Sequence, residues 1–224
     1  MKYHGHSLSI AIATIVTLSI VIVLYTLSLT GHIRTEDSTV IANIHPEIVY
    51  VPDTSTSTNL KTAFKVGVEI GNPETIQAIL LQETGGNNNN SIGNKGAPVG
   101  KRSYGLMQVQ VVAAKEVLTQ YPSMLKVYFE GKTLSTLSDE QIIAVLLTNQ
   151  EANIYFASYL FKYYLQLCNG NWDKAVASYN MGIGGVEQVS NYNQVDYVVS
   201  VKGLMESKVR PFNKRNNLTL TQRF

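Results

Sequence analysis

The chain has 224 residues, of which 45% are apolar and only 15% are charged, and its formal net charge is +2. So small a net charge argues against a nucleic-acid partner, and the low charged fraction indicates that part of the apolar content serves a membrane. Cys168 is the only cysteine, which excludes an internal disulfide, and the histidines all lie within residues 4–45. We therefore expect no metal site and no cofactor.

The first element in chain order is an apolar segment at residues 7–29, which contains no charged residue and is dominated by Ile, Val and Leu. As a helix it would be about 34 Å long, enough to cross a hydrocarbon core of about 30 Å. We therefore predict a transmembrane anchor at residues 7–29, preceded by a flank at residues 1–6. A cleaved signal peptide is the alternative, although its apolar region usually runs only about 7 to 15 residues.

Three further regions follow the anchor. Residues 30–60 are rich in Thr, Ser and Pro and show no apolar periodicity, which is typical of a tether. Residues 61–206 show helical patterning without convincing strand alternation, which predicts a mainly α domain. Residues 206–224 carry five Lys or Arg against one Glu. We predict a solvated basic tail at 207–224 that could be attracted to anionic wall or lipid groups, the alternative being a segment packed on the domain.

Capping residues predict where several helices of the domain begin and end. Asn72 and Pro73 are typical of a helix start and Gly85-Gly86 of its end. Ser138, with Gln141 three residues later, forms a capping-box pattern. Further helices are predicted at about 150–168, at 171–180 and at about 194–209, the last ending before Pro211.

Glu83 occupies an unexpected position in the helix that begins at Pro73. At 100° per residue it lies about 20° from Ile76, within the apolar stripe, whereas Glu74 lies about 160° away on the wet face. A partly desolvated carboxyl has a raised pKa and can donate a proton near neutral pH, as cleavage of a glycosidic bond requires. The alternative is a carboxylate whose end reaches solvent or a buried partner.

Three later motifs follow Glu83 in order. They are Gly-Leu-Met-Gln at residues 105–108, Asn-Ile at 153–154 in a long helix, and Tyr-Asn-x-Gly at 179–182 after a Trp-Asp helix start. Taken together with Glu83, they resemble the soluble lytic transglycosylases, a family similar to glycoside hydrolase family 23. The resemblance covers roughly residues 65 to 187. It implies a mainly α, lysozyme-like fold of the goose-type and soluble lytic transglycosylase class.

The resemblance also implies the site residues. Glu83 would be the sole catalytic acid and base, Met107 and Gln108 would line the sugar groove, and Tyr179 and Asn180 would face Glu83 across it. A substrate-holding serine of the family would correspond to Ser91, with Ser103 as the alternative. Thr84 departs from the family, which usually has Ser directly after the acid, and the spacing of 22 residues from Glu83 to Gly105 is longer than usual.

The activity implied is cleavage of the MurNAc-β-1,4-GlcNAc bond of peptidoglycan with formation of a 1,6-anhydro-MurNAc end. No Asp or Glu stands between Glu83 and Glu116, although a hydrolase usually needs a second carboxylate. A lysozyme-like hydrolase using Glu151 or Asp173 is one alternative. A non-catalytic wall-binding component of a virion or secretion system is another.

This activity predicts the location and partners of the chain. Because peptidoglycan lies outside the cytoplasmic membrane, the amino terminus should be cytoplasmic and the domain should lie on the outer, periplasmic side. The expected partners are peptidoglycan glycan strands, the membrane through the N-terminal helix, and other virion or secretion-system proteins. The membrane would be that of a bacterial envelope or of a virion.

Overall fold

The computed structural model of the chain describes residues 56–87 and 90–219. The predicted flank, the anchor at 7–29 and most of the predicted tether lie outside these ranges. No helix within them is long and apolar enough to cross a membrane.

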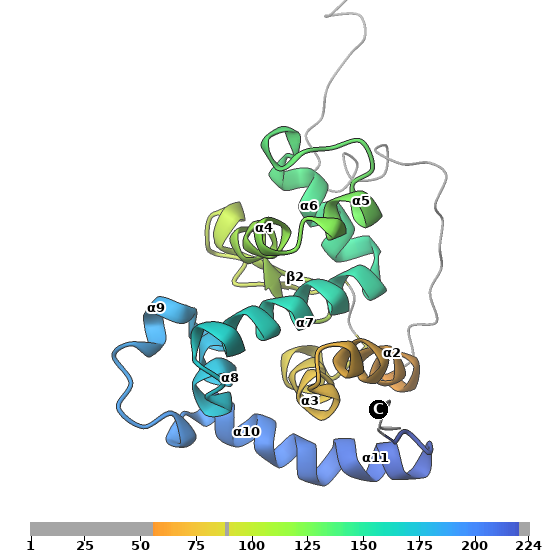
Figure 1. Ribbon diagram of the computed structural model, residues 1–224, viewed down its shortest axis with the longest axis vertical. Helices are drawn as coiled ribbons and strands as arrows, with labels where there is room; N and C mark the ends of the chain where they lie inside the picture. The colour runs from red at the N-terminus through yellow and green to blue at the C-terminus, as the bar shows by residue number, and fades with distance from the viewer. Residues whose placement is uncertain (1–55, 88–89, 220–224) are drawn as a thin grey trace, which may run out of the picture. The chain divides into compact units, whose positions relative to one another are not determined.

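The described residues form a mainly helical domain, in agreement with the predicted fold class (Figure 1). The α-helices are α2 (Thr56–Glu69), α3 (Pro73–Thr84), α4 (Val111–Gln120), α5 (Ser123–Tyr128), α6 (Asp139–Thr148), α7 (Gln150–Leu167), α8 (Trp172–Met181), α9 (Ile183–Val186), α10 (Asp196–Leu204) and α11 (Arg210–Arg215). Short 3₁₀ helices are η2 (Val99–Lys101), η3 (Leu134–Thr136) and η4 (Tyr192–Gln194), and η5 (Met205–Val209) is a π-helical turn.

Helix α7 is the centre of the domain. It contacts α2, α3, α4, α6 and α8, and Figure 1 shows it crossing the middle of the fold. Its buried residues, which include Ile154, Phe156, Leu160 and Phe161, cover most of its circumference, and the remaining side carries Glu151 and Gln166, which are exposed. A helix with so broad an apolar face is covered by neighbours over most of its surface. The other helices therefore pack around α7 and present their loops at its sides.

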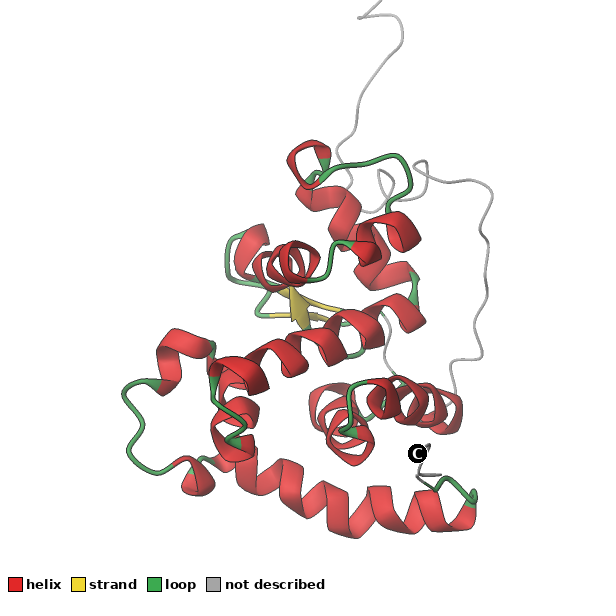
Figure 2. Cartoon of the chain, in the orientation of Figure 1, coloured by secondary structure: helices red, strands yellow, loops and turns green. Residues whose placement is uncertain are grey.

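A small antiparallel sheet accompanies the helices (Figure 2). Its strands are β1 (Ile92–Gly93), β2 (Ser103–Tyr104) and β3 (Val109–Gln110), in that order, with Ile92 opposite Tyr104 and Tyr104 opposite Val109. The sequence patterning did not predict these strands, because two residues are too few to show alternation. The sheet brings the loop after Glu83 beside the turn at residues 105–108.

The predicted boundaries of several helices agree closely with the structure, including 150–168 with α7 and 171–180 with α8, which Asn171 caps as predicted. Gly85 ends α3 in the left-handed conformation with φ 68°, and its N–H donates to the Leu81 carbonyl at 3.0 Å. Ser138 and Gln141 form the predicted capping box at the start of α6. Asn72 differs, because its side chain does not cap α3 and instead donates to the Ile70 carbonyl at 3.3 Å.

The folded domain begins earlier than the predicted boundary at residue 61. Helix α2 begins at Thr56, and the Asn59 side chain donates to the Gly86 carbonyl at 2.8 Å while being almost completely buried. Leu60 is also part of the core. Residues 56–60, predicted as tether, therefore belong to the domain and hold the loop that follows α3.

The C-terminal boundary is also wrong, because residues 207–215 are not a solvated tail. The chain continues from α10 through the π-helical turn η5 into α11, and Pro211 lies in the first turn of α11, where the missing N–H is tolerated. Val209 is fully buried, and the buried amides of Asn213 and Gln77 exchange two hydrogen bonds of 2.8 Å. Pro211 and Phe212 are half-buried.

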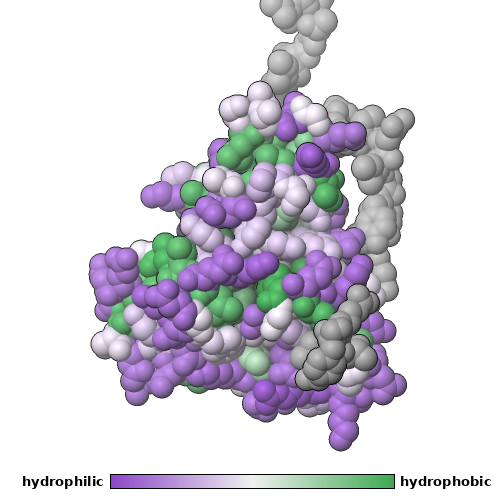
Figure 3. Space-filling model, viewed as in Figure 1, coloured by the Kyte–Doolittle hydropathy of each residue, from purple (hydrophilic) through white to green (hydrophobic). Residues whose placement is uncertain are grey.

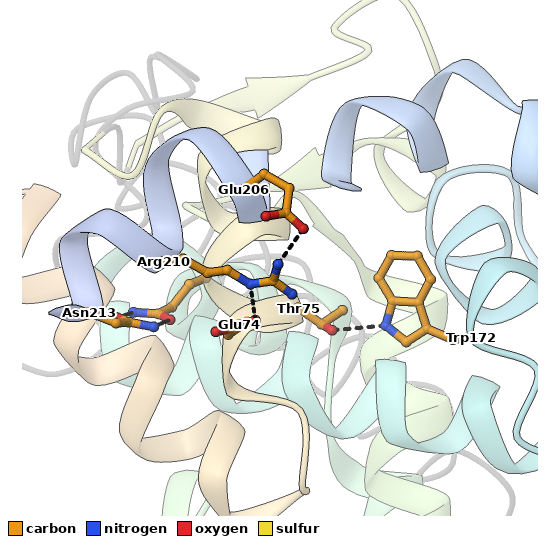
Figure 4. Close-up of polar contacts among 7 residues, drawn as sticks. Glu74, Thr75, Trp172, Glu206, Arg210 and Asn213 are labelled. Atoms are coloured by element: carbon orange, nitrogen blue, oxygen red, sulfur yellow. Dashed lines mark hydrogen bonds and ion pairs between the residues drawn. The ribbon is translucent and has the colours of Figure 1, made fainter. Parts of the chain in front are cut away.

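Two charged side chains on the outer side of this segment, Arg210 and Glu206, form ion pairs. Arg210 contacts Glu74 of α3 at 3.0 Å and also pairs with Glu206 (Figure 4). Hydrophilic side chains predominate along α10 and α11 on the face shown in Figure 3. Within the described residues, Lys208, Arg210, Lys214 and Arg215 are exposed and lie on the outer side of this segment, whose inner side packs on α3, while Arg223 lies outside the described ranges.

Candidate active site

A cleft of about 330 Å³ lies where α3, the turn before β3, α4, α7 and α8 meet. Its lining combines carboxylates, hydroxyls and amides with a few apolar side chains. The lining residues are Glu83, Ser103, Gln108, Val109, Gln110, Val112, Ala113, Glu116, Leu160, Tyr164, Tyr179, Asn180, Met181 and Gly182. The structure therefore brings together four of the six predicted site residues, namely Glu83, Gln108, Tyr179 and Asn180.

Glu83 lies in the last turn of α3, half-buried, with its carboxyl at the cleft. The Tyr197 hydroxyl donates to Glu83 Oε1 at 2.5 Å. Burial raises the pKa of Glu83, and the hydrogen bond from Tyr197 offsets part of that rise. The carboxyl thus keeps its proton to a higher pH than an exposed glutamate, as the apolar stripe predicted.

Two tyrosine hydroxyls stay protonated beside this carboxyl. Burial, and next the negative charge of Glu83, raise the pKa of both Tyr179 and Tyr197 well above the ordinary range. Tyr197 belongs to α10 and was not identified from the sequence. It stands 114 residues after Glu83, and no linear spacing links the two. Tyr179 donates to the Met107 carbonyl at 2.7 Å.

The turn at residues 105–108 adopts a conformation that demands glycine. Gly105 has φ 77°, and a Cβ there would lie 2.3 Å from both the Leu146 carbonyl oxygen and Asn153 Nδ2. Gln108 also has a positive φ, at 51°. Backbone in this region is costly for residues other than glycine, so neighbouring contacts must hold the turn.

Asn153 supplies those contacts from the centre of α7. It is fully buried; its Oδ1 accepts from the Met107 N–H at 2.8 Å, and its Nδ2 donates to the Tyr104 and Leu146 carbonyls at 2.9 and 3.0 Å. The Thr84 hydroxyl adds a bond of 2.8 Å to the Leu106 carbonyl. The Asn-Ile motif and Thr84 therefore position the turn relative to the end of α3.

Gln108 and the two candidate serines form a second set of contacts. Gln108 Nε2 donates to the Ser91 carbonyl at 3.2 Å and the Gly105 carbonyl at 2.8 Å, while Gln108 Oε1 accepts from the Ser103 hydroxyl at 2.9 Å. Ser103 lines the cleft and Ser91 does not. Of the two candidate serines, the alternative, Ser103, thus lies at the cleft, while Ser91 contacts Gln108 through its main-chain carbonyl.

Met107 also differs from its predicted place. Its side chain is fully buried in the core and does not reach the cleft. Its contribution is the main-chain carbonyl that accepts the Tyr179 hydroxyl and the N–H that Asn153 holds. A methionine side chain that fills the core beneath a turn is expected for an apolar, adaptable residue.

Carboxylates other than Glu83 occupy distinct places. Glu116 of α4 lines the cleft, half-buried. Glu151 lines a separate hollow, and Asp173 pairs with Lys202 at 2.6 Å, so neither residue predicted for a hydrolase reaches the cleft. Over residues 56–87 and 90–219, no group of three or more His, Cys, Asp or Glu could hold a metal ion.

Comparison with known proteins adds one match. The family model described as the transglycosylase SLT domain matches residues 68–196, which is more than half of the chain. The matched region begins within α2, contains the cleft and ends at the start of α10. Searches of curated proteins and of solved structures found no match.

Proposed function

Because the chain belongs to the transglycosylase SLT domain family, and so to proteins that act on peptidoglycan, we propose that it is a lytic transglycosylase with Glu83 as its only catalytic acid and base. It would cleave the MurNAc-β-1,4-GlcNAc bond and leave a 1,6-anhydro-MurNAc end. The observation that carries this proposal is the half-buried carboxyl of Glu83 at the cleft, with a raised pKa and a hydrogen bond from Tyr197.

In the first step, the protonated Glu83 carboxyl donates its proton to the oxygen that links C1 of MurNAc to C4 of GlcNAc. The C1–O bond breaks, GlcNAc leaves with a 4-hydroxyl, and the 2-acetamido group of MurNAc stabilises C1. The raised pKa of Glu83 supplies the proton near neutral pH. The Tyr197 hydroxyl then stabilises the carboxylate through a charge-assisted hydrogen bond.

In the second step, the Glu83 carboxylate takes the proton of the C6 hydroxyl, and O6 attacks C1 as the acetamido oxygen departs. The anhydro ring closes and Glu83 regains its proton, so no water is consumed. One carboxylate flanked by tyrosine hydroxyls is sufficient for this sequence. The amide of Asn180 and the hydroxyl of Ser103 line the same cleft and could bind the sugar hydroxyl and acetamido groups.

A lysozyme-like hydrolase is the second candidate, and Glu116 is the observation that favours it. Hydrolytic glycosidases use two carboxylates on either side of the bond. Among the cleft residues in the described part of the chain, Glu116 is the only carboxylate besides Glu83. Glu116 therefore replaces Glu151 and Asp173 as the residue on which a hydrolytic mechanism would depend.

The test compares Glu83→Gln with Glu116→Gln in the full chain and identifies the products of sacculus digestion by mass spectrometry. We expect 1,6-anhydro ends, a loss of at least about 10²-fold for Glu83→Gln, and activity within about tenfold of wild type for Glu116→Gln. Reducing ends together with an equally inactive Glu116→Gln would establish the hydrolase. An intact fold without any cleavage by the wild-type chain would support a non-catalytic wall-binding module.

The location follows as a further part of the proposal. The apolar segment at residues 7–29 and the position of peptidoglycan outside the membrane support a membrane-held enzyme whose domain lies on the outer side. Such an enzyme would open the wall locally for a bacterial envelope, a secretion or conjugation machine, or a virion. Protease added to intact spheroplasts should remove the domain, and protection of the domain would overturn this topology.

A further inference from the structure

A second hollow, of about 360 Å³, lies on another side of α7. We call it the tyrosine hollow, and its lining residues are Ser123, Met124, Val127, Tyr128, Glu151, Tyr155 and Tyr159. On a helical projection, Leu160 and Tyr164, which line the cleft, lie about 140° and 180° from Tyr155. The hollow and the cleft therefore open on opposite sides of one helix, and the hollow has no part in the mechanism above.

Aromatic rings form the wall of the tyrosine hollow. Tyr155 and Tyr159 lie nearly parallel, with ring centroids 6.3 Å apart and an interplanar angle of 24°. Tyr128 faces them from α5, 6.4 Å from Tyr155, and all three side chains are half-buried. Tyr121 supports Tyr159 edge-on at 4.8 Å. The rings are thus held in place by one another while part of each surface is open to a ligand.

Polar groups surround the rings at the rim. The Tyr155 hydroxyl donates to Glu69 at 2.9 Å, and the exposed carboxylate of Glu151 lines the hollow. The Tyr128 hydroxyl makes no hydrogen bond within the described part of the chain. Burial, and next the negative charge of Glu151, raise the pKa of Tyr128, so its hydroxyl stays a donor. The lining therefore offers ring faces, the Tyr128 phenol and the Glu151 carboxylate, while Glu69 lies behind Tyr155 and holds its hydroxyl.

This combination fits a neutral sugar ring. A pyranose has C–H groups that pack on aromatic faces, hydroxyls that donate to carboxylates, and oxygens that accept from a phenol. The volume of the hollow falls in the range of small-ligand sites, about 300 to 1,000 Å³. Among the lining residues Glu151 is charged and no Lys or Arg is present, which disfavours anionic lipid head groups and other negative ligands. A hydroxyl-rich, uncharged ligand is the chemistry that the hollow matches best.

We propose that the tyrosine hollow is a second glycan-binding site, which holds neutral N-acetylhexosamine units of a strand other than the one in the cleft. The identity of this ligand rests on the proposed function, because an enzyme that cleaves peptidoglycan is surrounded by its glycan strands. A strand held behind α7 would keep the cleft close to its substrate, and linked sites can raise overall binding by about 10² to 10⁴ without changing either site. The hollow would thus act on attachment to sacculi and not on bond cleavage.

The first experiment needs no change to the hollow. The full chain carrying Glu83→Gln, labelled with ¹³C in its tyrosine rings, is titrated with chitotetraose and followed by NMR. We expect the ring signals of Tyr128, Tyr155 and Tyr159 to shift together with that of Tyr179 at the cleft. If the signal of Tyr179 shifts and the other three do not, the second site is refuted.

The second experiment measures attachment. Tyr159→Leu in the Glu83→Gln chain should weaken binding to purified sacculi by at least about tenfold, while Tyr192→Leu, which changes a tyrosine outside both cavities, should leave it unchanged. Val127→Arg is a second variant that spares the core, because Val127 is 69% exposed at the rim and a long side chain there would fill the hollow. Normal sacculus binding by both hollow variants overturns the proposal.

Turnover separates this inference from the proposed function. With Glu83 intact, Tyr159→Leu and Val127→Arg should cleave a soluble glycan fragment within about twofold of wild type. Peptidoglycan cleavage without a chitotetraose-induced shift at the hollow would refute the second glycan-binding site and leave the proposed function intact. A chitotetraose-induced shift at the hollow without any peptidoglycan cleavage by the wild-type chain would refute the proposed catalytic function and support the glycan-binding site.

Discussion

Tyr197→Phe isolates the hydrogen bond that the structure places on the catalytic carboxyl. The substitution keeps the ring, which is buried in α10, and removes only the hydroxyl that lies 2.5 Å from Glu83 Oε1. This hydroxyl stabilises the charged form of Glu83 and lowers its pKa against the rise caused by burial. Without it, Glu83 should hold its proton to a still higher pH.

The magnitude follows from the charge on the acceptor. A hydrogen bond to a charged group contributes about 1.5 to 3 kcal/mol, and because Glu83 is only half-buried we take the lower end. Since about 1.36 kcal/mol corresponds to a factor of ten, the deprotonation equilibrium of Glu83 should change by about tenfold. The free enzyme must hold a protonated Glu83, so kcat/KM falls as pH rises through its pKa, and that fall should move upward by about one pH unit.

The assay is the pH dependence of kcat/KM on a soluble glycan fragment, for wild type, Tyr197→Phe and Tyr192→Phe. Tyr192 is the matched control, because its ring lies against Lys174 and does not line the cleft. The control should follow the wild-type profile. A Tyr197→Phe profile whose alkaline limb stays in place or moves to lower pH would refute the assignment of Glu83 as a proton donor stabilised by this hydroxyl.

Three further changes test the acid and the turn beside it. Because burial raises the folded-state pKa of Glu83 above 4.5, its contribution to stability is present below that pH and is lost as pH rises through the raised pKa. Glu83→Gln should therefore have a higher melting temperature than wild type at pH 8 but not at pH 4. Each kcal/mol of unfolding free energy corresponds to about 2 to 4 °C, and an equal difference in melting temperature at both pH values would contradict the raised pKa. Gly105→Ala should cost at least about 1 to 3 kcal/mol in urea unfolding, since its Cβ would lie 2.3 Å from the Leu146 carbonyl oxygen; an unchanged midpoint would contradict the strain. Asn153→Ala should cost about 3 kcal/mol or more because it leaves buried groups of the turn unpaired, and a loss below about 1 kcal/mol would contradict that role.

The features that could be predicted from the sequence are those that depend on neighbouring residues. The position of Glu83 in an apolar stripe follows from helical geometry, and the capping box at Ser138 uses residues three positions apart. The order of the motifs also predicted the family, which the match at residues 68–196 confirms. Each of these signals is readable in a short window or as a linear order.

The features that could not be predicted depend on contacts between distant segments. Tyr197 acts on Glu83 only because α10 packs on α3. The resemblance predicted that the Met107 side chain lines the groove. In the structure, Asn153 of α7 accepts a hydrogen bond from the Met107 N–H, and the Met107 side chain is buried in the core. A proline usually ends a helix, so the sequence predicted a helix end before Pro211. In the structure, α11 begins after the π-helical turn η5, and Pro211 lies in the first turn of α11, where proline is tolerated.

Residues 207–224 differ most between the sequence prediction, which made them a solvated tail, and the structure, in which residues 207–215 pack on the domain. A solvated basic tail could be deleted with a loss only of salt-dependent attachment to sacculi. In the structure, the deletion would instead expose the pocket of Val209 and leave the buried amide of Gln77 without the two bonds from Asn213. Helix α3 carries both Gln77 and Glu83, so the end of the chain supports the helix that positions the catalytic carboxyl.

Deletion of residues 207–224 should therefore lower stability and activity together. Losing the Val209 side chain costs about 1.5 to 3 kcal/mol, and losing the two hydrogen bonds between Gln77 and Asn213, at about 0.5 to 1.5 kcal/mol each, costs about 1 to 3 kcal/mol more. At about 2 to 4 °C per kcal/mol, the melting temperature should drop by roughly 10 °C, and turnover of a soluble glycan fragment should fall with it. Deletion of residues 217–224 is the matched control, because it removes Arg223 but keeps α11. A chain ending at residue 206 that melts and turns over as wild type would show that the C-terminal helix contributes nothing to the catalytic domain.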